Sequence, residues 1–290
     1  MVLLVTTAAE LRNWRVTQPG QRLAFVPTMG ALHEGHIRLV ERAREIADAV
    51  VVSIFVNPTQ FGVGEDFELY PRTLENDLAL LDDLADVVYA PSVDDVYPPL
   101  APPPVKSAGP AGAGFEGAAR PGHFDGMLTV VNRLFDIVNP DVAVFGQKDA
   151  QQVHLVRRMA SERGGPEIDV VTTVREDDGL ARSSRNRFLS SQERAAASAV
   201  PETVRTVAAH INTGVSAALA AGRAVLAAEP LARLEYLELV SPADFTPVDD
   251  TFHGEATLVV AARFGTTRLL DTESITVPEN QQAKGPQPDE

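Results

Sequence analysis

The sequence changes from a strand pattern to a helix pattern within residues 27–36, PTMGALHEGH. The preceding residues 23–26, LAFV, predict a buried strand, and residues 37–49 carry the apolar spacing of a helix. Between them, His33 and His36 flank a glycine at the predicted helix start. Backbone N–H groups and the positive end of a helix dipole can hold a phosphate there. A histidine adds a donor whose charge changes near neutral pH, so the pattern favours a nucleotide whose α-phosphate is attacked.

The alternation of strand and helix patterns continues through the first half of the chain. Short apolar runs predict further strands at residues 50–56, 87–90, 142–145 and 169–174. Amphipathic patterns predict helices at residues 73–84, 126–138 and 149–161. Strands separated by helices form parallel βαβ units with right-handed crossovers. We therefore expect an α/β fold with a Rossmann-like, doubly wound parallel sheet, whose ligands bind at the carboxyl ends of the strands.

The composition changes after residue 174, where a second domain is expected. Alanine-rich helices are predicted at residues 190–211 and 215–228, with Pro201 bending or breaking the first. Alternating patterns predict antiparallel strands at residues 234–239, 258–263 and 268–270. We expect a nucleotide- and substrate-binding domain at residues 1–174, a small α+β lid domain at 175–277, and a disordered tail at 278–290. Residues 91–122, rich in Pro, Gly and Ala, are interpreted as a loop or a flexible flap.

Composition excludes several classes of protein. The chain has no cysteine, which excludes disulfides, thiolate nucleophiles and zinc–thiolate sites and fits a cytoplasmic location. Its formal net charge of −15 disfavours nucleic acid as a partner. It has no apolar run of membrane-spanning length and no signal-peptide pattern at its start, so no membrane association is expected. A small anionic substrate must therefore be held by local cations.

Three further clusters carry candidate chemistry. Asn57 and Gln60 follow the predicted strand 50–56, where a side-chain amide can orient a hydroxyl or carboxylate, although an Asn-Pro turn also explains Asn57. Lys148 follows another strand and can neutralise phosphate charge, and Asp149 can cap the next helix. Residues 179–187, GLARSSRNR, form a cationic loop that is either a phosphate clamp or a solvated linker. The chain has no P-loop pattern, so these groups would hold phosphates without one.

The motifs, taken together, identify a family. They are PTMGALHEGH (27–36), IFVNPTQF (54–61), YPR (70–72), RPGHF (120–124), FGQKD (145–149) and SSRN (183–186). In order and content they resemble the pantothenate synthetases, or pantoate–β-alanine ligases, of the His-x-Gly-His nucleotidylyltransferase superfamily. The resemblance runs from about residue 23 to residue 271. It implies a ligase that activates pantoate with ATP as pantoyl adenylate, releasing pyrophosphate, and then transfers the pantoyl group to β-alanine, releasing AMP.

The resemblance also implies roles for individual residues. The implied ATP contacts are Met29, Gly30, His33, Gly35, His36, Gly146, Lys148, Asp149, Val174, Arg182, Ser183, Ser184 and Arg185. The implied pantoate and β-alanine contacts are Pro27, Asn57, Gln60 and Gln152. The implied catalytic residues are His33, His36, Lys148 and Arg185. Mg²⁺ would be held mainly by ATP phosphates, with Asp77 as a metal contact, for which a solvated helix residue is the favoured alternative. A homodimer in the cytoplasm is implied.

Some positions depart from the family pattern, and other functions stay open. Gln147, Ala150 and Arg182 stand where members often carry Glu, Tyr and an apolar residue, which affects the expected ATP affinity. One alternative is a nucleotidylyltransferase whose acceptor is a phosphorylated alcohol, and another is a nucleotide-binding paralogue without turnover. A tRNA-charging fragment is disfavoured by the acidity of the chain. The apolar run 50–56 would serve dimerisation at a sheet edge or pack in the core.

Overall fold

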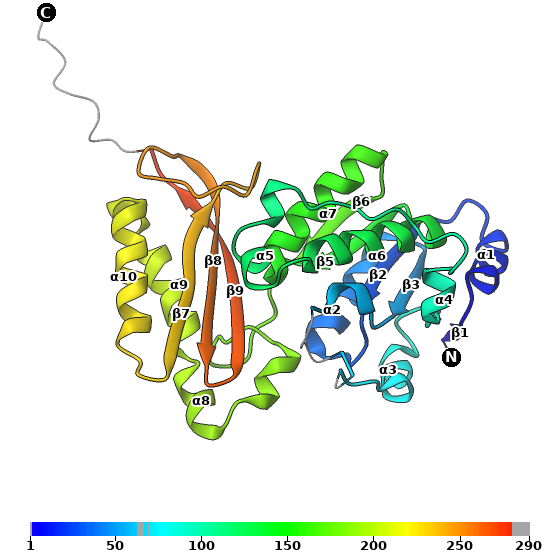
Figure 1. The fold of residues 1–290 in the computed structure, drawn as a ribbon, viewed down its shortest axis with the longest axis horizontal. Helices are drawn as coiled ribbons and strands as arrows, with labels where there is room; N and C mark the ends of the chain where they lie inside the picture. Colours follow the sequence, from blue (N-terminus) through cyan, green and yellow to red (C-terminus); the bar gives the residue numbers. More distant parts are fainter. Residues whose placement is uncertain (1, 63–66, 69, 280–290) are drawn as a thin grey trace, which may run out of the picture. The chain divides into compact units, whose positions relative to one another are not determined.

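The computed structural model describes residues 2–62, 67–68 and 70–279 (Figure 1). The chain divides into two compact units, one of Met1–Gln147 and Gln151–Val174, the other of Lys148–Ala150 and Arg175–Glu290. Apart from residues 278 and 279, the predicted tail lies outside the described residues. Among the helices that the structure describes, none combines the length and apolar character needed to span a bilayer.

The described part of the first unit contains a six-stranded sheet in which every pairing is parallel. Its strands are β1 (Leu3–Val5), β2 (Leu23–Thr28), β3 (Ala49–Ile54), β4 (Val87–Tyr89), β5 (Val142–Gly146) and β6 (Glu167–Val171). Their order is β1-β4-β3-β2-β5-β6, which confirms the predicted fold class. Because β3 pairs with β2 and β4, the apolar run at 50–56 is an interior strand, and its suggested place at an edge is wrong.

Alternate residues of the strands face two separate apolar cores. Phe25 and Val51 belong to one core, and Ala24 and Val50 belong to the other. The helices that contribute to the first core are α1 (Ala8–Val16), α4 (Val93–Val96), α6 (His123–Val138) and α7 (Ala150–Arg163). Those that contribute to the second are α2 (Glu34–Ile46) and α3 (Leu74–Leu81). This two-sided burial explains the continuous apolar runs of the strands and is typical of a doubly wound sheet.

Several helix boundaries differ from those predicted; α3, for example, ends at Leu81 and not at residue 84. The α2 helix ends at Ile46, not at residue 49, because Asp48 already pairs with the chain before β2. The Asp48 carboxylate accepts the backbone N–H of Arg22 at 2.9 Å, and the N–H of Ala49 donates to the Arg22 carbonyl at 3.1 Å. The α6 helix begins at His123, three residues before the predicted start, where Gly122 (φ 81°) turns the chain.

Residues 91–122 are anchored to the body of the first unit. They contain α4 (Val93–Val96), the 3₁₀ turn η2 (Pro110–Gly112) and α5 (Glu116–Ala119). The buried side chain of Gln151, on α7, donates to the carbonyls of Ala111 and Gly114 at 2.8 and 3.0 Å and accepts the N–H of Glu116 at 3.0 Å. This anchoring favours the interpretation as a fixed loop over that of a flexible flap.

The second unit packs helices on an antiparallel sheet of order β7-β8-β9 (Figure 1). Its strands are β7 (Ala232–Val240), β8 (Gly254–Phe264) and β9 (Thr267–Val277). Its helical elements are η4 (Ser184–Phe188), α8 (Ser191–Ala196), α9 (Ala199–His210), η5 (Ile211–Thr213) and α10 (Val215–Ala227). The predicted helix at 190–211 is broken at residues 197–198, so Pro201 lies in the first turn of α9. Proline is tolerated there because first-turn N–H groups lack helical partners.

Candidate active site

A buried carboxylate holds the loop that follows β2. Gly30 (φ 80°) and Ala31 (φ 51°) both have left-handed backbone conformations, which are uncommon for alanine. The Asp77 carboxylate, on α3, accepts the backbone N–H groups of Ala31 at 3.0 Å and Leu32 at 2.9 Å. The Thr73 hydroxyl donates to the same carboxylate. Asp77 is 1% exposed, so its interpretation as a solvated helix residue is wrong, whereas its metal contact stays a prediction.

His33 and His36 form the first turn of α2 and fix each other. His33 is the N-cap residue, and its Nδ1 accepts the N–H of Gly35 at 3.1 Å. The Nδ1 of His36 accepts the N–H of His33 at 3.3 Å, and the two ring centroids lie 4.1 Å apart. Because a backbone N–H can only donate, the neutral form of each imidazole carries its hydrogen on Nε2. Both histidines therefore have the tautomer that donates through Nε2.

Glycine is required between the two histidines. A Cβ at residue 35 would lie 2.9 Å from Cε1 of His33 and 3.0 Å from its Nδ1. Both distances are too short for an unstrained contact, so a larger residue would displace the imidazole ring from its capping position. The glycine of the motif thus has a local steric cause in addition to the close approach that a phosphate would need.

Asn57 and Gln60 come together at the 3₁₀ turn η1 (Pro58–Gln60), just after β3. Asn57 is 1% exposed, and its Nδ2 donates to Gln60 Oε1 at 3.1 Å. Gln60 Nε2 lies 3.0 Å from the sulfur of Met29, on the loop after β2. The structure thus joins the ends of β2 and β3 through these side chains. Asn57 is held inside the protein by its partners, so its direct contact with substrate stays a prediction.

The RPGHF motif supports this turn, a role that the sequence did not reveal. The Nδ1 of His123 lies 2.9 Å from the backbone carbonyl of Gln60, and Nη2 of Arg120 donates to the same oxygen at 3.4 Å. Nη1 of Arg120 is also 3.1 Å from Nε2 of His123. The motif was visible in the sequence, but its contact with Gln60 joins residues 63 positions apart and has no local signal.

A cavity of about 340 Å³ adjoins the loop after β2. Met29 and Gly30 line it, together with residues at or just after the ends of β3 and β4 and with residues 67, 71–74 and 77. Of the described residues that line it, Arg72 is the only cation and Asp77 the only carboxylate. A mainly apolar cavity with a few fixed polar groups is typical of a small-molecule site.

Other predicted contacts follow β5 and β6. Gly146 ends β5, and Lys148 and Asp149 follow it in the 3₁₀ turn η3 (Gln147–Asp149), half-buried and exposed respectively. Gln152 is half-buried on α7, next to the buried Gln151. The remaining predicted contacts of the first unit, Pro27 on β2 and Val174 after β6, are half-buried. The contacts of these residues with ATP or pantoate stay predictions.

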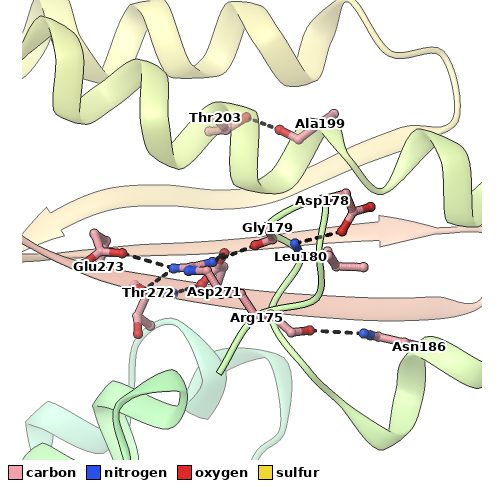
Figure 2. Close-up of polar contacts among 11 residues, drawn as sticks. Arg175, Asp178, Gly179, Leu180, Asn186, Ala199, Thr203, Asp271, Thr272 and Glu273 are labelled. Carbon is pink, nitrogen blue, oxygen red and sulfur yellow. Dashed lines mark hydrogen bonds and ion pairs between the residues drawn. The ribbon is translucent and has the colours of Figure 1, made fainter. Parts of the chain in front are cut away.

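The SSRN motif lies in the second unit, in a segment that begins at an anchored arginine (Figure 2). Nη1 of Arg175 donates to the Asp271 carboxylate at 2.6 Å and to the Gly179 carbonyl at 3.0 Å, and Nη2 donates to the Glu273 carboxylate at 3.0 Å. Asp271 is fully buried, and burial raises its pKa although Arg175 opposes the shift. The start of the segment is thereby fixed to β9.

A second ion-pair network fixes the same segment further along. Arg194 donates to the carboxylates of Asp178 at 2.6 Å and Glu176 at 2.7 Å. Asn186 donates to Glu176 at 2.7 Å and to the Ala181 carbonyl at 3.1 Å. The hydrogen bond from Arg194 lowers the pKa of Asp178. Burial alone would raise the pKa of Glu176, but Asn186 and Arg194 together bring it below its ordinary value.

The motif itself starts a 3₁₀ helix. Ser183 caps η4, and its Oγ accepts the N–H of Arg185 at 3.2 Å. Arg185 is exposed, whereas Arg182, Ser183 and Ser184 are half-buried. The loop is therefore held from both sides while its arginine reaches solvent, which suits capture of an anion.

No cage for a metal ion is found among the residues that the structure describes: they contain no group of three or more His, Cys, Asp or Glu side chains that could hold one. Asp77 is the predicted metal contact, and its carboxylate already accepts two backbone N–H groups. Any Mg²⁺ at this site would therefore take most of its ligands from a phosphate chain and water.

Comparison with known proteins gives consistent matches over almost the whole chain. The family model described as pantoate-beta-alanine ligase matches residues 3–274. A pantothenate synthetase of Leifsonia xyli is 56% identical over 90% of this chain and 91% of its own length. The pantothenate synthetase structure from Thermus thermophilus has a TM-score of 0.87 at 46% identity, covering 94% and 99% of the two chains. A Francisella tularensis pantoate-beta-alanine ligase, crystallised with ATP β-γ and β-alanine, has a TM-score of 0.76 at 32% identity, covering 94% and 97%.

Proposed function

The chain belongs to the pantoate-beta-alanine ligase family, and from this membership we propose that it uses ATP to join pantoate to β-alanine, forming pantothenate. One structural observation supports the proposal most: the rigid loop and helix start that hold His33 and His36 as Nε2 donors at the end of β2. This is the place where parallel α/β sheets bind phosphates.

The first step is adenylation of pantoate. Its carboxylate is already ionised at neutral pH, so no general base is needed. A carboxylate oxygen bonds to the α-phosphorus while the bond from that phosphorus to the bridging oxygen of pyrophosphate breaks. Donors that face the developing negative charge are the main source of rate in such transfers. We assign that role to His33, His36 and Lys148, with Ser183 and Arg185 holding the outer phosphates.

The second step is acyl transfer. The amine of β-alanine attacks the pantoyl carbonyl carbon, an amide bond forms, and AMP leaves with the electron pair of the broken acyl–oxygen bond. The β-alanine nitrogen loses one proton when its ammonium group becomes the attacking amine and a second as the amide forms, and both protons go to solvent. We assign the holding of pantoate to Gln60 and Gln152, whose neutral amides suit a hydroxy acid better than a phosphate ester. No enzyme nucleophile is needed, in keeping with a sequence without cysteine.

Mg²⁺ is the implied metal. Bound to the triphosphate of ATP, it would neutralise part of the negative charge of the phosphates. The residues present fit this limited role, because Asp77 is the only carboxylate among the described residues lining the cavity and is fixed beside the loop. We further propose a homodimer in the cytoplasm, in line with the family resemblance of the sequence.

Exchange of labelled pyrophosphate into ATP tests the proposed function. With Mg²⁺ present, we expect exchange that requires pantoate, and AMP release that additionally requires β-alanine. Phosphopantetheine should neither replace pantoate nor raise the melting temperature. Folded protein that shows no pantoate-dependent exchange and no AMP release would contradict the proposal, and exchange driven by phosphopantetheine would favour a different nucleotidylyltransferase.

A further inference from the structure

A run of hydrogen bonds leads from the hydroxyl of the half-buried Tyr97 to the amide of Gln60. Tyr97 follows α4, and its hydroxyl lies 2.8 Å from Oδ1 of Asn57. Nδ2 of Asn57 donates in turn to Oε1 of Gln60 at 3.1 Å. Tyr97 is not part of any motif quoted for the family, and it touches none of the proposed ATP contacts through these bonds. This run of hydrogen bonds bears on the orientation of the Asn57 and Gln60 amides.

The orientation of the Asn57 amide is determined by one-way partners. The backbone N–H of Thr59, which can only donate, points at Asn57 Oδ1 at 3.3 Å. The carbonyl of Gly126, which can only accept, receives Asn57 Nδ2 at 3.3 Å. If the amide were turned over, its NH₂ group would face the N–H of Thr59 and its oxygen would face the carbonyl of Gly126, so neither pair could form a hydrogen bond. Asn57 is 1% exposed, so water does not relieve such a mismatch.

The orientation of Gln60 follows from that of Asn57. Because Asn57 presents its NH₂ group, Gln60 must present Oε1 to it. The NH₂ group of Gln60 then faces the other way, where its nearest partner is the sulfur of Met29 at 3.0 Å. A thioether is a weak acceptor, so the N–H groups remain available to a stronger one. Gln60 is thereby set to donate to an oxygen of the substrate.

Tyr97 makes the shortest hydrogen bond to the Asn57 side chain, and its direction is fixed. Burial raises the pKa of Tyr97, although its hydrogen bonds with Thr59 and Asn57 partly oppose the shift, so the phenol keeps its proton at neutral pH. That single proton goes to Asn57 Oδ1. The Thr59 hydroxyl lies 3.0 Å from the same Oδ1 and 3.2 Å from the Tyr97 oxygen, and its one proton goes to one of these two acceptors.

We propose that Tyr97 is a positioning residue for pantoate: through Asn57 it holds the Gln60 amide with its NH₂ group toward the substrate. The inference rests on the proposed function, because it assumes that Gln60 contacts pantoate. In the proposed contact, the N–H groups of Gln60 donate hydrogen bonds to hydroxyl or carboxylate oxygens of pantoate. A substrate that could only donate a hydrogen bond at that point would find no acceptor there and would be rejected.

The Tyr97→Phe variant removes the hydroxyl and keeps the ring. We expect a roughly three- to tenfold rise in the KM for pantoate, equivalent to one ordinary hydrogen bond, with kcat and the KM for ATP within about twofold of wild type. Tyr89→Phe is the control, because Tyr89 is a buried tyrosine whose hydroxyl binds Asp95 and not Asn57. An unchanged pantoate KM in folded Tyr97→Phe overturns the proposal, as does an equal rise in Tyr89→Phe.

The Gln60→Glu variant tests the polarity of the contact. A carboxylate can still accept from Asn57 but offers no donor, so we expect the pantoate KM to rise by about 100-fold or more. If the variant keeps a wild-type KM, Gln60 presents its oxygen and the proposal fails. Should Tyr97→Phe not fold, Thr59→Val removes the other hydroxyl that holds Asn57 Oδ1, at 3.0 Å, so at least about a twofold rise in pantoate KM is expected, and no change contradicts positioning of Gln60 through Asn57. Wild-type protein without pantoate-dependent exchange would refute the proposed function, whereas an active wild type with an unaffected Tyr97→Phe variant refutes the positioning role alone.

Discussion

At the scale of single residues, Asp77 has the largest structural consequence for the proposed phosphate loop. Asp77→Ala leaves the N–H groups of Ala31 and Leu32 without their acceptor, which costs about 1–3 kcal/mol for each group that stays buried. Asp77→Asn keeps one acceptor oxygen and should lose about half as much. We expect melting temperatures in the order wild type, Asp77→Asn, Asp77→Ala, and a KM for ATP that rises in the same order. Wild-type stability in Asp77→Asn, with a raised Mg²⁺ requirement, would instead make Asp77 a metal residue.

His36 is the residue whose loss should cost most activity. His36→Ala removes an Nε2–H donor from the proposed α-phosphate site, and the loss of such a group typically lowers turnover by about 10²–10⁴-fold. Its hydrogen bond to His33 is long, at 3.3 Å, so the fold should persist. Pyrophosphate exchange and circular dichroism measure the two effects. Folded His36→Ala with wild-type exchange would refute the assigned role.

Residues with a local sequence signal could be assigned in advance, and residues that act across the fold could not. His33 and His36 cap their own helix within four positions, so the motif revealed them. Asp77 reaches a loop 46 positions away, and Tyr97 reaches Asn57 across 40. Nothing in the neighbourhood of either residue in the sequence indicates those partners. Asn57 caps the turn that its Asn-Pro pair indicates, but its burial could not be read from that pair.

At the scale of elements, the contact between α6 and η1 sets the position of Gln60. A Cβ at Gly126 would lie 2.0 Å from the Thr59 carbonyl oxygen and 2.5 Å from its carbon, so Gly126→Ala must push the turn away. We expect a loss of about 1–3 kcal/mol in unfolding free energy and a raised KM for pantoate. Gly114→Ala is the control, because a Cβ there meets nothing within 4 Å. Wild-type stability and pantoate KM in Gly126→Ala would show that α6 does not position the turn.

Periodicity identified most of the long elements but misplaced some of their ends. The apolar spacing of α2 carries on past Ile46, so the pattern alone extends the helix. The helix stops because Asp48 and Ala49 bond to Arg22 at the start of β2, a contact across the fold. The strand β1 was not predicted, because three residues at a sheet edge give almost no periodic signal. The helix α1 was also not predicted, although Thr7 and Glu10 form a capping box at its start.

At the scale of the whole molecule, the ion pairs of Arg194 in the second unit make the stability of the protein depend on pH in the acidic range. The pKa values of Glu176 and Asp178 lie below their ordinary values of 4.5 and 3.8, so their stabilising contribution is present above those values and is lost as the pH falls through the lowered ones. Arg194→Gln should therefore lower the melting temperature at pH 7, and the difference from wild type should narrow as the pH falls through the lowered pKa values of the two carboxylates. A difference that stays the same down to a pH at which both carboxylates are protonated would contradict this origin.

The alternation of strands and helices predicted the first unit's architecture because its sheet is buried on both faces, which leaves a strong apolar signal in every central strand. No comparable pattern in the sequence shows which groups on separate segments contact the same ligand. Lys148 follows β5, and Arg185 lies in a loop fixed by Arg175 and Arg194 within the second unit. Their joint action with His36 on one ATP molecule is the central claim of the proposed mechanism.

A crystal structure with pantoate and a non-hydrolysable ATP analogue tests that claim most directly. The expected result places Nε2 of His36, Nζ of Lys148 and the side chains of Ser183 and Arg185 within hydrogen-bond distance of one triphosphate, with Gln60 Nε2 on a pantoate oxygen. A triphosphate bound without His36, Lys148 or the Ser183–Arg185 loop, with these groups left in separate places, would contradict it.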